Sequence, residues 1–222
     1  MNPDRRRILL ALGLAPLAAP LAAPLTALAQ GAPVAGEQYI ELSPPLPVEV
    51  PGKINVIEFF WYGCPHCYDL EPLIEPWARK LPSDVAFRRV PAVFNNPQWT
   101  LDAQIFYSLD ALGLVERLHR PLFDAIHRDH LRTADPAALH EWLTNKGVDV
   151  KKFDAAMRSF GVQSRVRRAA QLSIAYQITG TPAMAVQGRY TINSDAVKSH
   201  EALLSVTDYL IGVVRKSMAG KG

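Results

Sequence analysis

The amino-acid sequence predicts an α/β protein in which a block of helices interrupts a β-sheet. β-Branched and apolar runs occur at residues 54–60 and 85–94, whereas residues 97–161 show helical spacing throughout. A third observation is that Cys64 and Cys67, the two cysteines of the 222-residue chain, directly follow the first run. The predicted order is a first strand, a strand that leads into the cysteine pair and a helix, another strand, the helical block, a helix, a hairpin and a final helix.

The first 29 residues have the composition of a secretory signal peptide. Three arginines at positions 5–7 are followed by an apolar run rich in Ala, Leu and Pro, which ends in Ala27-Leu28-Ala29. A membrane anchor is the alternative. Prolines between residues 16 and 24 interrupt a helix that would need about 20 regular apolar residues to span a bilayer. We therefore expect cleavage after Ala29 and export, by the general or the twin-arginine route.

The charge of the chain changes when this segment is removed. Lys plus Arg falls from 24 to 21 and Asp plus Glu from 21 to 20, so the net charge falls from +3 to +1. Such a balance does not indicate a nucleic-acid partner. No later apolar run reaches transmembrane length, so we expect a mature protein that is not embedded in a membrane.

The first strand and the helix after it are predicted from local pattern. Residues 54–60 read Ile-Asn-Val-Ile-Glu-Phe-Phe, a nearly continuous apolar and β-branched run that is typical of a buried central strand. Pro65 suits the first turn of a helix, where a missing N–H leaves no hydrogen bond unmade. Pro72 and Pro76 are expected to kink or end this helix. A second strand is expected over residues 85–94.

The remaining elements follow from apolar periodicity, capping residues and turn signals. The expected helices of the block lie at residues 98–112, 115–128, 136–146 and 150–160. The later elements are a helix at 162–177, a hairpin of 183–186 with 189–192, and a final helix at 196–216. A strand–CxxC–helix–strand unit that later gains a hairpin and a helix resembles the thioredoxin arrangement.

Three roles are open to Cys64 and Cys67: a structural disulfide, two ligands of a metal site, or a redox pair. Export would place them in an oxidising compartment, where a disulfide is expected. A disulfide that closes a loop of about four residues contributes roughly 2 kcal/mol through chain entropy, against about 3 kcal/mol for fifteen residues. A disulfide between these two cysteines would therefore stabilise the fold only weakly. Zinc would need two further ligands, and we expect no metal and no cofactor.

Cys64 is expected to be the reactive cysteine because it stands at a helix start. Free N–H groups and the positive end of the helix dipole favour its thiolate, and the His66 ring could donate to the same sulfur. Such a position lowers a cysteine pKa from about 8.5 into a range of roughly 3.5–7.5. A stabilised thiolate makes the disulfide a stronger oxidant. Cys67, one turn further along the helix, is expected to be less exposed and to act as the resolving cysteine.

Glu58 is an unexpected acid within a strand that otherwise reads as buried. It either leaves the core at an edge or bulge, or it is a partly buried acid with a raised pKa that exchanges protons with Cys67. Thr181 and Pro182 precede the hairpin, and in a thioredoxin arrangement this loop lies opposite the cysteines. Its backbone groups could there pair with an extended substrate chain.

The segments Val56-Ile57-Glu58-Phe59-Phe60, Cys64-Pro65-His66-Cys67-Tyr68 and Gly180-Thr181-Pro182-Ala183 together resemble the DsbA family of periplasmic thiol oxidases. The resemblance covers essentially all of the mature chain. It implies a thioredoxin fold with an inserted all-helical domain and a cis Thr181–Pro182 bond. The implied catalytic residues are Cys64, Pro65, His66, Cys67 and Glu58, and the implied substrate-binding residues are Thr181 and Pro182. The implied division is a signal peptide at 1–29, thioredoxin parts at 30–96 and 162–222, and the insertion at 97–161.

The resemblance also implies a catalytic cycle in the periplasm. Reduced, unfolded exported proteins would take the Cys64–Cys67 disulfide through a mixed disulfide at Cys64, and a DsbB-like quinone-linked membrane oxidase would restore it. We expect a monomer. The stretch Phe87-Arg88-Arg89-Val90 gives no secure match for a buried lysine near Glu58, which leaves open how Glu58 is compensated.

Two alternative functions remain open. A disulfide isomerase or reductase of the same fold often carries a dimerisation domain, for which the roughly 30 residues before Ile54 leave no room. A redox-inactive peptide-binding chaperone would not need an intact Cys-Pro-His-Cys.

Other polar and aromatic residues carry weaker signals. His119, His127 and His130 are expected on solvated helix faces rather than in a metal site, since no acidic or cysteine ligands at suitable spacing accompany them. Solvated positions are also expected for Arg165, Arg167 and Arg168. Three aromatic residues either line an apolar substrate groove or pack in the core: Trp61, Tyr62 and Phe94.

Overall fold

The computed structural model describes residues 31–220. The expected signal peptide, with its cleavage site after Ala29, lies outside the described residues. The chain divides into the units Met1–Gly31 and Ala32–Gly222, and the second unit holds every element described below. Within residues 31–220, no helix is long and apolar enough to cross a bilayer.

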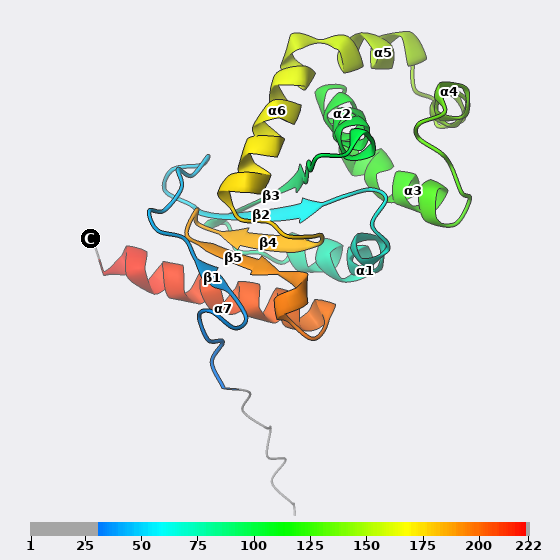
Figure 1. Ribbon diagram of the computed structural model, residues 1–222. Helices are drawn as coiled ribbons and strands as arrows, with labels where there is room; N and C mark the ends of the chain where they lie inside the picture. The colour runs from blue at the N-terminus through cyan, green and yellow to red at the C-terminus, as the bar shows by residue number, and fades with distance from the viewer. Residues whose placement is uncertain (1–30, 221–222) are drawn as a thin grey trace, which may run out of the picture. The chain divides into compact units, whose positions relative to one another are not determined.

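A five-stranded mixed sheet forms the centre of this unit, in the order β1-β5-β4-β2-β3 (Figure 1). Its strands are β1 (Ile40–Glu41), β2 (Ile54–Phe60), β3 (Val85–Pro91), β4 (Ala183–Val186) and β5 (Tyr190–Asn193). β2 pairs with β3 in parallel, and the other pairs are antiparallel. β2 is therefore flanked on both sides, as expected for a buried central strand.

Helices cover both faces of the sheet. α1 (Pro65–Arg79) and α7 (His200–Ala219) lie on one face, and α2 (Pro97–Ala111) and α6 (Phe160–Ala175) lie on the other (Figure 1). The helices between β3 and α6 are completed by α3 (Val115–His127), α4 (Pro136–Asn145) and α5 (Val150–Arg158). This is the predicted thioredoxin fold with an inserted group of helices. The predicted domain boundaries at residues 96 and 161 stay a prediction.

From Ile54 to Phe59, side chains of β2 alternate between two hydrophobic cores. Ile54 and Val56 pack with α1 and α7, whereas Ile57 and Phe59 pack with the inserted helices. Because side chains of a strand alternate between faces, Glu58 belongs to the face that α1 covers. This places its carboxyl group directly beneath the helix that carries the cysteines.

The observed elements differ from the predicted ones mainly at their ends. α1 runs through Pro72 and Pro76 to Arg79, so the prolines do not end it. Pro72 lies on the exposed face, where water can bind the carbonyl group that the proline leaves without a donor. The final helix begins at His200 because Ser199 caps it, and Ser194–Ala196 forms a short 3-10 turn. The short strand β1 takes the place of the first strand in the predicted order.

Candidate active site

A tight turn carries the chain from β2 into α1. The Cys64 N–H donates to the Trp61 carbonyl (3.0 Å), which closes the turn. Gly63 is required here, since a Cβ at this position would overlap the Trp61 ring. Cys64 is the N-cap residue of α1, with extended backbone, and Pro65 follows in the first turn. The strand and the turn thus deliver Cys64 to the positive end of the helix.

Cys64 has the electrostatic environment of a stabilised thiolate. Its pKa is lowered to about 5, first by the thiol of Cys67, which donates to it, and then by the Thr181 hydroxyl and the backbone N–H groups of Cys67 and His66. Burial opposes this shift. The Cys64 side chain makes no N-cap hydrogen bond of full geometry, yet its sulfur lies at the positive end of the helix dipole. Cys64 remains 7% exposed, whereas Cys67 is fully buried.

Cys67 has the opposite character. Burial, contact with Cys64 and the negative charge of Glu58 raise its pKa well above the usual value. Both cysteines are free thiols in this structure. At neutral pH the reduced pair therefore holds one negative charge and one proton, with the charge on Cys64 and the proton on Cys67.

The loop before β4 lies against Cys64, although 117 residues separate the two in sequence. In its protonated form the Cys64 thiol donates to the Thr181 carbonyl (3.2 Å), and the Thr181–Pro182 peptide bond is cis. The structure thus brings together the cysteine pair and the Thr-Pro segment that the sequence singled out.

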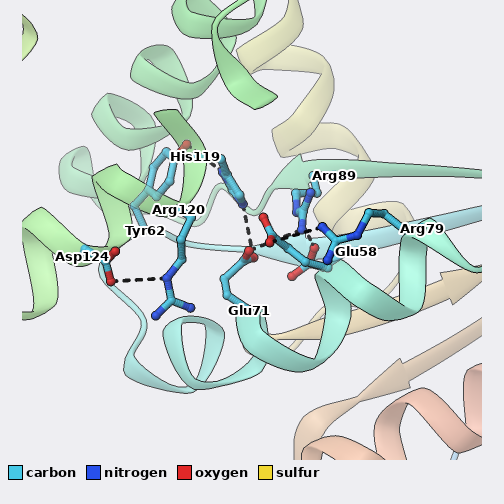
Figure 2. A network of polar contacts seen from close by, with 9 residues as sticks. Glu58, Tyr62, Glu71, Arg79, Arg89, His119, Arg120 and Asp124 are labelled. Atoms are coloured by element: carbon cyan, nitrogen blue, oxygen red, sulfur yellow. Dashed lines mark hydrogen bonds and ion pairs between the residues drawn. The ribbon is translucent and has the colours of Figure 1, made fainter. Parts of the chain in front are cut away.

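Glu58 is fully buried within a regular strand, so the alternative of an edge or bulge position is wrong. Its Oε2 accepts from the Arg89 Nε at 3.0 Å (Figure 2). Among the described residues, its Oε1 is the one buried side-chain oxygen or nitrogen without a hydrogen-bond partner. Burial raises the pKa of Glu58 to about 7, and the charge of Glu71 adds to this while Arg89 opposes it. Glu58 can therefore gain or lose a proton near neutral pH.

Arg89 answers the question that the sequence left open. In the parallel pairing of β2 with β3, Glu58 stands directly opposite Arg89. The guanidinium also reaches Glu71 of α1 (Nη2 to Oε2, 3.4 Å). One partly buried cation thus compensates two buried carboxylates. Arginine takes the place in which the sequence comparison looked for a lysine.

His119 extends this cluster toward the inserted helices (Figure 2). Burial and the charge of Arg89 lower its pKa to about 3, so its imidazole is neutral and carries one N–H. That hydrogen belongs on Nε2, which donates to Glu71 Oε1 (3.2 Å), because Nδ1 can then accept from the Tyr62 hydroxyl (2.9 Å). This assignment leaves every polar hydrogen of the three groups paired.

The expectation that all three histidines lie on solvated faces is wrong for His119, which is 3% exposed. His127 is half-buried, with its ring against Tyr68, and His130 is exposed as expected. Within the described residues, no group of three His, Cys, Asp or Glu side chains could hold a metal ion. The arginines at positions 165, 167 and 168 are exposed, as expected.

The His66 ring points away from the Cys64 sulfur. No hydrogen bond within residues 31–220 joins the imidazole to Cys64, and the exposed ring lies 6.3 Å from that of His200. His66 influences Cys64 through its backbone N–H instead. The two rings border a hollow of about 360 Å³ between the starts of α1 and α7, together with Asp195 and Lys198.

The aromatic residues singled out in the sequence differ in how far they are buried. Tyr62 is a core residue, 1% exposed. Trp61 and Phe94 are half-buried and both pack on Trp99, with ring centroids at 4.3 and 4.7 Å. The Trp61 ring covers Gly63, so this aromatic group lies next to the catalytic turn.

Comparison with known proteins agrees with this geometry. Residues 74–205 match the DSBA-like thioredoxin domain family. The chain is 48% identical over 176 residues to the thiol:disulfide interchange protein DsbA of Azotobacter vinelandii, covering 79% of this chain and 82% of the relative. It is 45% identical over 206 residues to DsbA of Bordetella parapertussis, covering 92% and 96%. The crystal structure of Pseudomonas aeruginosa DsbA superposes with a TM-score of 0.80 at 43% identity, covering 84% of this chain and 96% of that one.

Proposed function

The chain belongs to the DsbA family of thiol:disulfide interchange proteins, and we propose that within this family it is an oxidase that donates the Cys64–Cys67 disulfide to reduced proteins. It is a thiol:disulfide oxidoreductase with a thioredoxin fold. The observation that supports the oxidising direction is the unequal acidity of its two cysteines. A pair whose reduced form holds a stabilised thiolate gives up its disulfide readily.

The first step is attack of a substrate thiolate on Cys64 Sγ in the oxidised protein. A sulfur–sulfur bond forms between substrate and Cys64, the bond to Cys67 breaks, and the electron pair leaves on Cys67. Because burial raises the pKa of Cys67, this thiolate takes up a proton at once. We assign that proton to Glu58, whose pKa of about 7 lets it donate and later recover one.

The second step releases the product. A second substrate thiolate attacks the substrate sulfur of the mixed disulfide, and Cys64 leaves as a thiolate. The low pKa of Cys64 makes it a good leaving group. Two substrate thiols have then become a disulfide, and the protein holds one thiolate and one thiol. Main-chain groups around Thr181 and Pro182 would hold the substrate in extended form beside Cys64.

The proposed setting follows from the sequence of the N-terminal segment and from the family. We propose that the protein is exported to the periplasm, that its substrates are reduced, unfolded exported proteins, and that a DsbB-like quinone-linked membrane oxidase restores the disulfide. We further propose that it acts as a monomer without metal or cofactor.

The oxidised protein is expected to convert a reduced unfolded protein to its disulfide form with one disulfide transferred per molecule, and Cys64→Ser is expected to abolish the transfer. Equilibration with glutathione gives the reduction potential. We expect a value well above −200 mV, as opposed to the roughly −270 mV of thioredoxin, and DsbA is itself the standard example of so oxidising a pair. A value near that of thioredoxin would replace the oxidase by a reductase.

A further inference from the structure

The inserted helices hold the catalytic turn through their side chains. Asp102 of α2 accepts from the Trp61 indole N–H (2.7 Å). His119 of α3 accepts from the Tyr62 hydroxyl (2.9 Å), and His127 at the end of α3 bonds the Tyr62 carbonyl (2.8 Å). Each of the two residues that begin the turn is thus tied to a helix that is not part of the sheet.

His127 is the anchor that acts on the backbone of the turn. A carbonyl oxygen can only accept, so the His127 Nε2 carries the hydrogen of this bond. The bonded carbonyl belongs to the peptide group between Tyr62 and Gly63, inside the turn that the Cys64 N–H closes. Gly63 has no side chain that could fix this peptide group from within.

α3 also contacts Tyr68, the residue that directly follows Cys67. The His127 ring stacks on Tyr68, which follows Cys67, with centroids 4.8 Å apart and planes 15° apart. The Tyr68 hydroxyl donates to Asp124 (3.0 Å), and the Arg120 guanidinium covers the Tyr68 ring at 4.6 Å. His127 therefore contacts the chain both before Cys64 and after Cys67.

We propose that His127 is a positioning residue for the redox reaction: its Nε2–H holds the Tyr62 carbonyl, and the turn in consequence places the Cys64 sulfur at the start of α1. The inference rests on the proposed use of Cys64 as the sulfur that forms the mixed disulfide. The physical reason is that the field of a helix start falls off within its first turn. A turn free to shift its peptide groups would move the sulfur out of that field for part of the time.

Two substitutions separate the hydrogen bond from packing. His127→Gln keeps an amide N–H at about the distance of Nε2 from the backbone but removes the ring. His127→Phe keeps the ring against Tyr68 but removes the donor. If His127 served only to pack α3 against α1, the glutamine variant would be the more damaged of the two. If it positions the turn, the phenylalanine variant is the one with altered Cys64 chemistry.

The experiment measures the thiolate absorbance at 240 nm of the reduced full chain against pH, together with the rate of alkylation by iodoacetamide at pH 5, near the Cys64 pKa. His127→Phe is expected to raise the pKa of Cys64 by about one unit, which lowers the alkylation rate several-fold at that pH. His127→Gln is expected to keep the wild-type pKa, even where its melting temperature is lower. His127→Asn, whose amide is too short to reach the carbonyl, carries the same prediction as His127→Phe if the latter does not fold.

Equal Cys64 pKa values in wild type, His127→Phe and His127→Asn would overturn the inference, and so would a glutamine variant shifted as far as the phenylalanine one. These outcomes leave the proposed function untouched. A wild-type Cys64 pKa near the ordinary 8.5 would instead remove the basis of the proposed function, so the two failures are distinct.

Discussion

Cys64 and Cys67 are three residues apart, yet their surroundings push their acidity in opposite directions. Around Cys64, at the surface, donors converge on the sulfur: a thiol, a hydroxyl and the first N–H groups of α1. Beneath Cys67, in the core, an acid and the loss of water disfavour negative charge. The difference explains why the disulfide is readily transferred to a substrate. When it is reduced, one electron pair is stabilised as the Cys64 thiolate, and Cys67 takes up a proton from the acid beneath it.

The two regions also differ in what holds them. The surface region is fixed by a turn, a helix start and a loop from the far end of the chain. The core region is a charge cluster in which Arg89 compensates Glu58 and Glu71 together. Substitutions in one region should therefore change stability with pH, and substitutions in the other should change thiol reactivity.

The largest expected effect is on stability and concerns Arg89. Arg89→Met leaves two buried carboxylates without their cation, and we expect the free energy of unfolding at pH 8 to fall by about 3 kcal/mol. The matched control is Arg88→Met, because Arg88 makes a half-exposed ion pair with Glu49 and should cost less than about 1 kcal/mol. Urea unfolding of both variants provides the measurement.

The cost of Arg89→Met should depend on pH in a definite direction. The pKa values of Glu58 and Glu71 are raised to about 7 in the folded protein. Below about pH 4.5 both acids are protonated in the folded and in the unfolded protein, and they do not lower the free energy of unfolding. As pH rises through the folded pKa, the acids become charged in the core and the free energy of unfolding falls. The loss should be deeper without Arg89, so the difference between variant and wild type should grow from pH 4.5 to pH 8. A difference independent of pH would contradict the charge cluster.

A smaller effect is expected for the proton on Cys67. Glu58→Gln cannot exchange a proton, and we expect the attack of a reduced peptide on the oxidised protein to slow by about tenfold or more at pH 7. Thiolate formation at Cys64 should be nearly unchanged, because Glu58 is not among the groups that shift its pKa. Stopped-flow fluorescence across pH follows both steps. Identical rate profiles for wild type and variant would remove Glu58 from the mechanism.

The surface half of the site could be predicted from the sequence because its signals are local. A buried strand followed by Cys64 and Pro65 defines a cysteine at a helix start without knowledge of the rest of the fold. The Thr181-Pro182 segment before a hairpin was found in the same way, with the family resemblance as support. The direction of the His66 ring stayed open, since nothing local determines which way an exposed side chain turns.

The core half could be predicted only in part because it depends on packing. Glu58 was found as an anomaly in its strand, but its partner follows from strand register, which sets it opposite Arg89. His119 was taken for a solvated residue. The available signal was its spacing, since Leu122 and Phe123, three and four residues later, place it on the apolar face of α3.

The central claim is that one cysteine of the reduced pair is a thiolate and the other a thiol over the whole neutral range. Titration of the reduced protein from pH 3 to pH 10, followed by thiolate absorbance at 240 nm, tests it most directly. The account predicts a rise worth one thiolate centred near pH 5, absent in Cys64→Ser, and no second rise below pH 9. Two thiolates that appear together near the ordinary cysteine pKa of about 8.5 would contradict it.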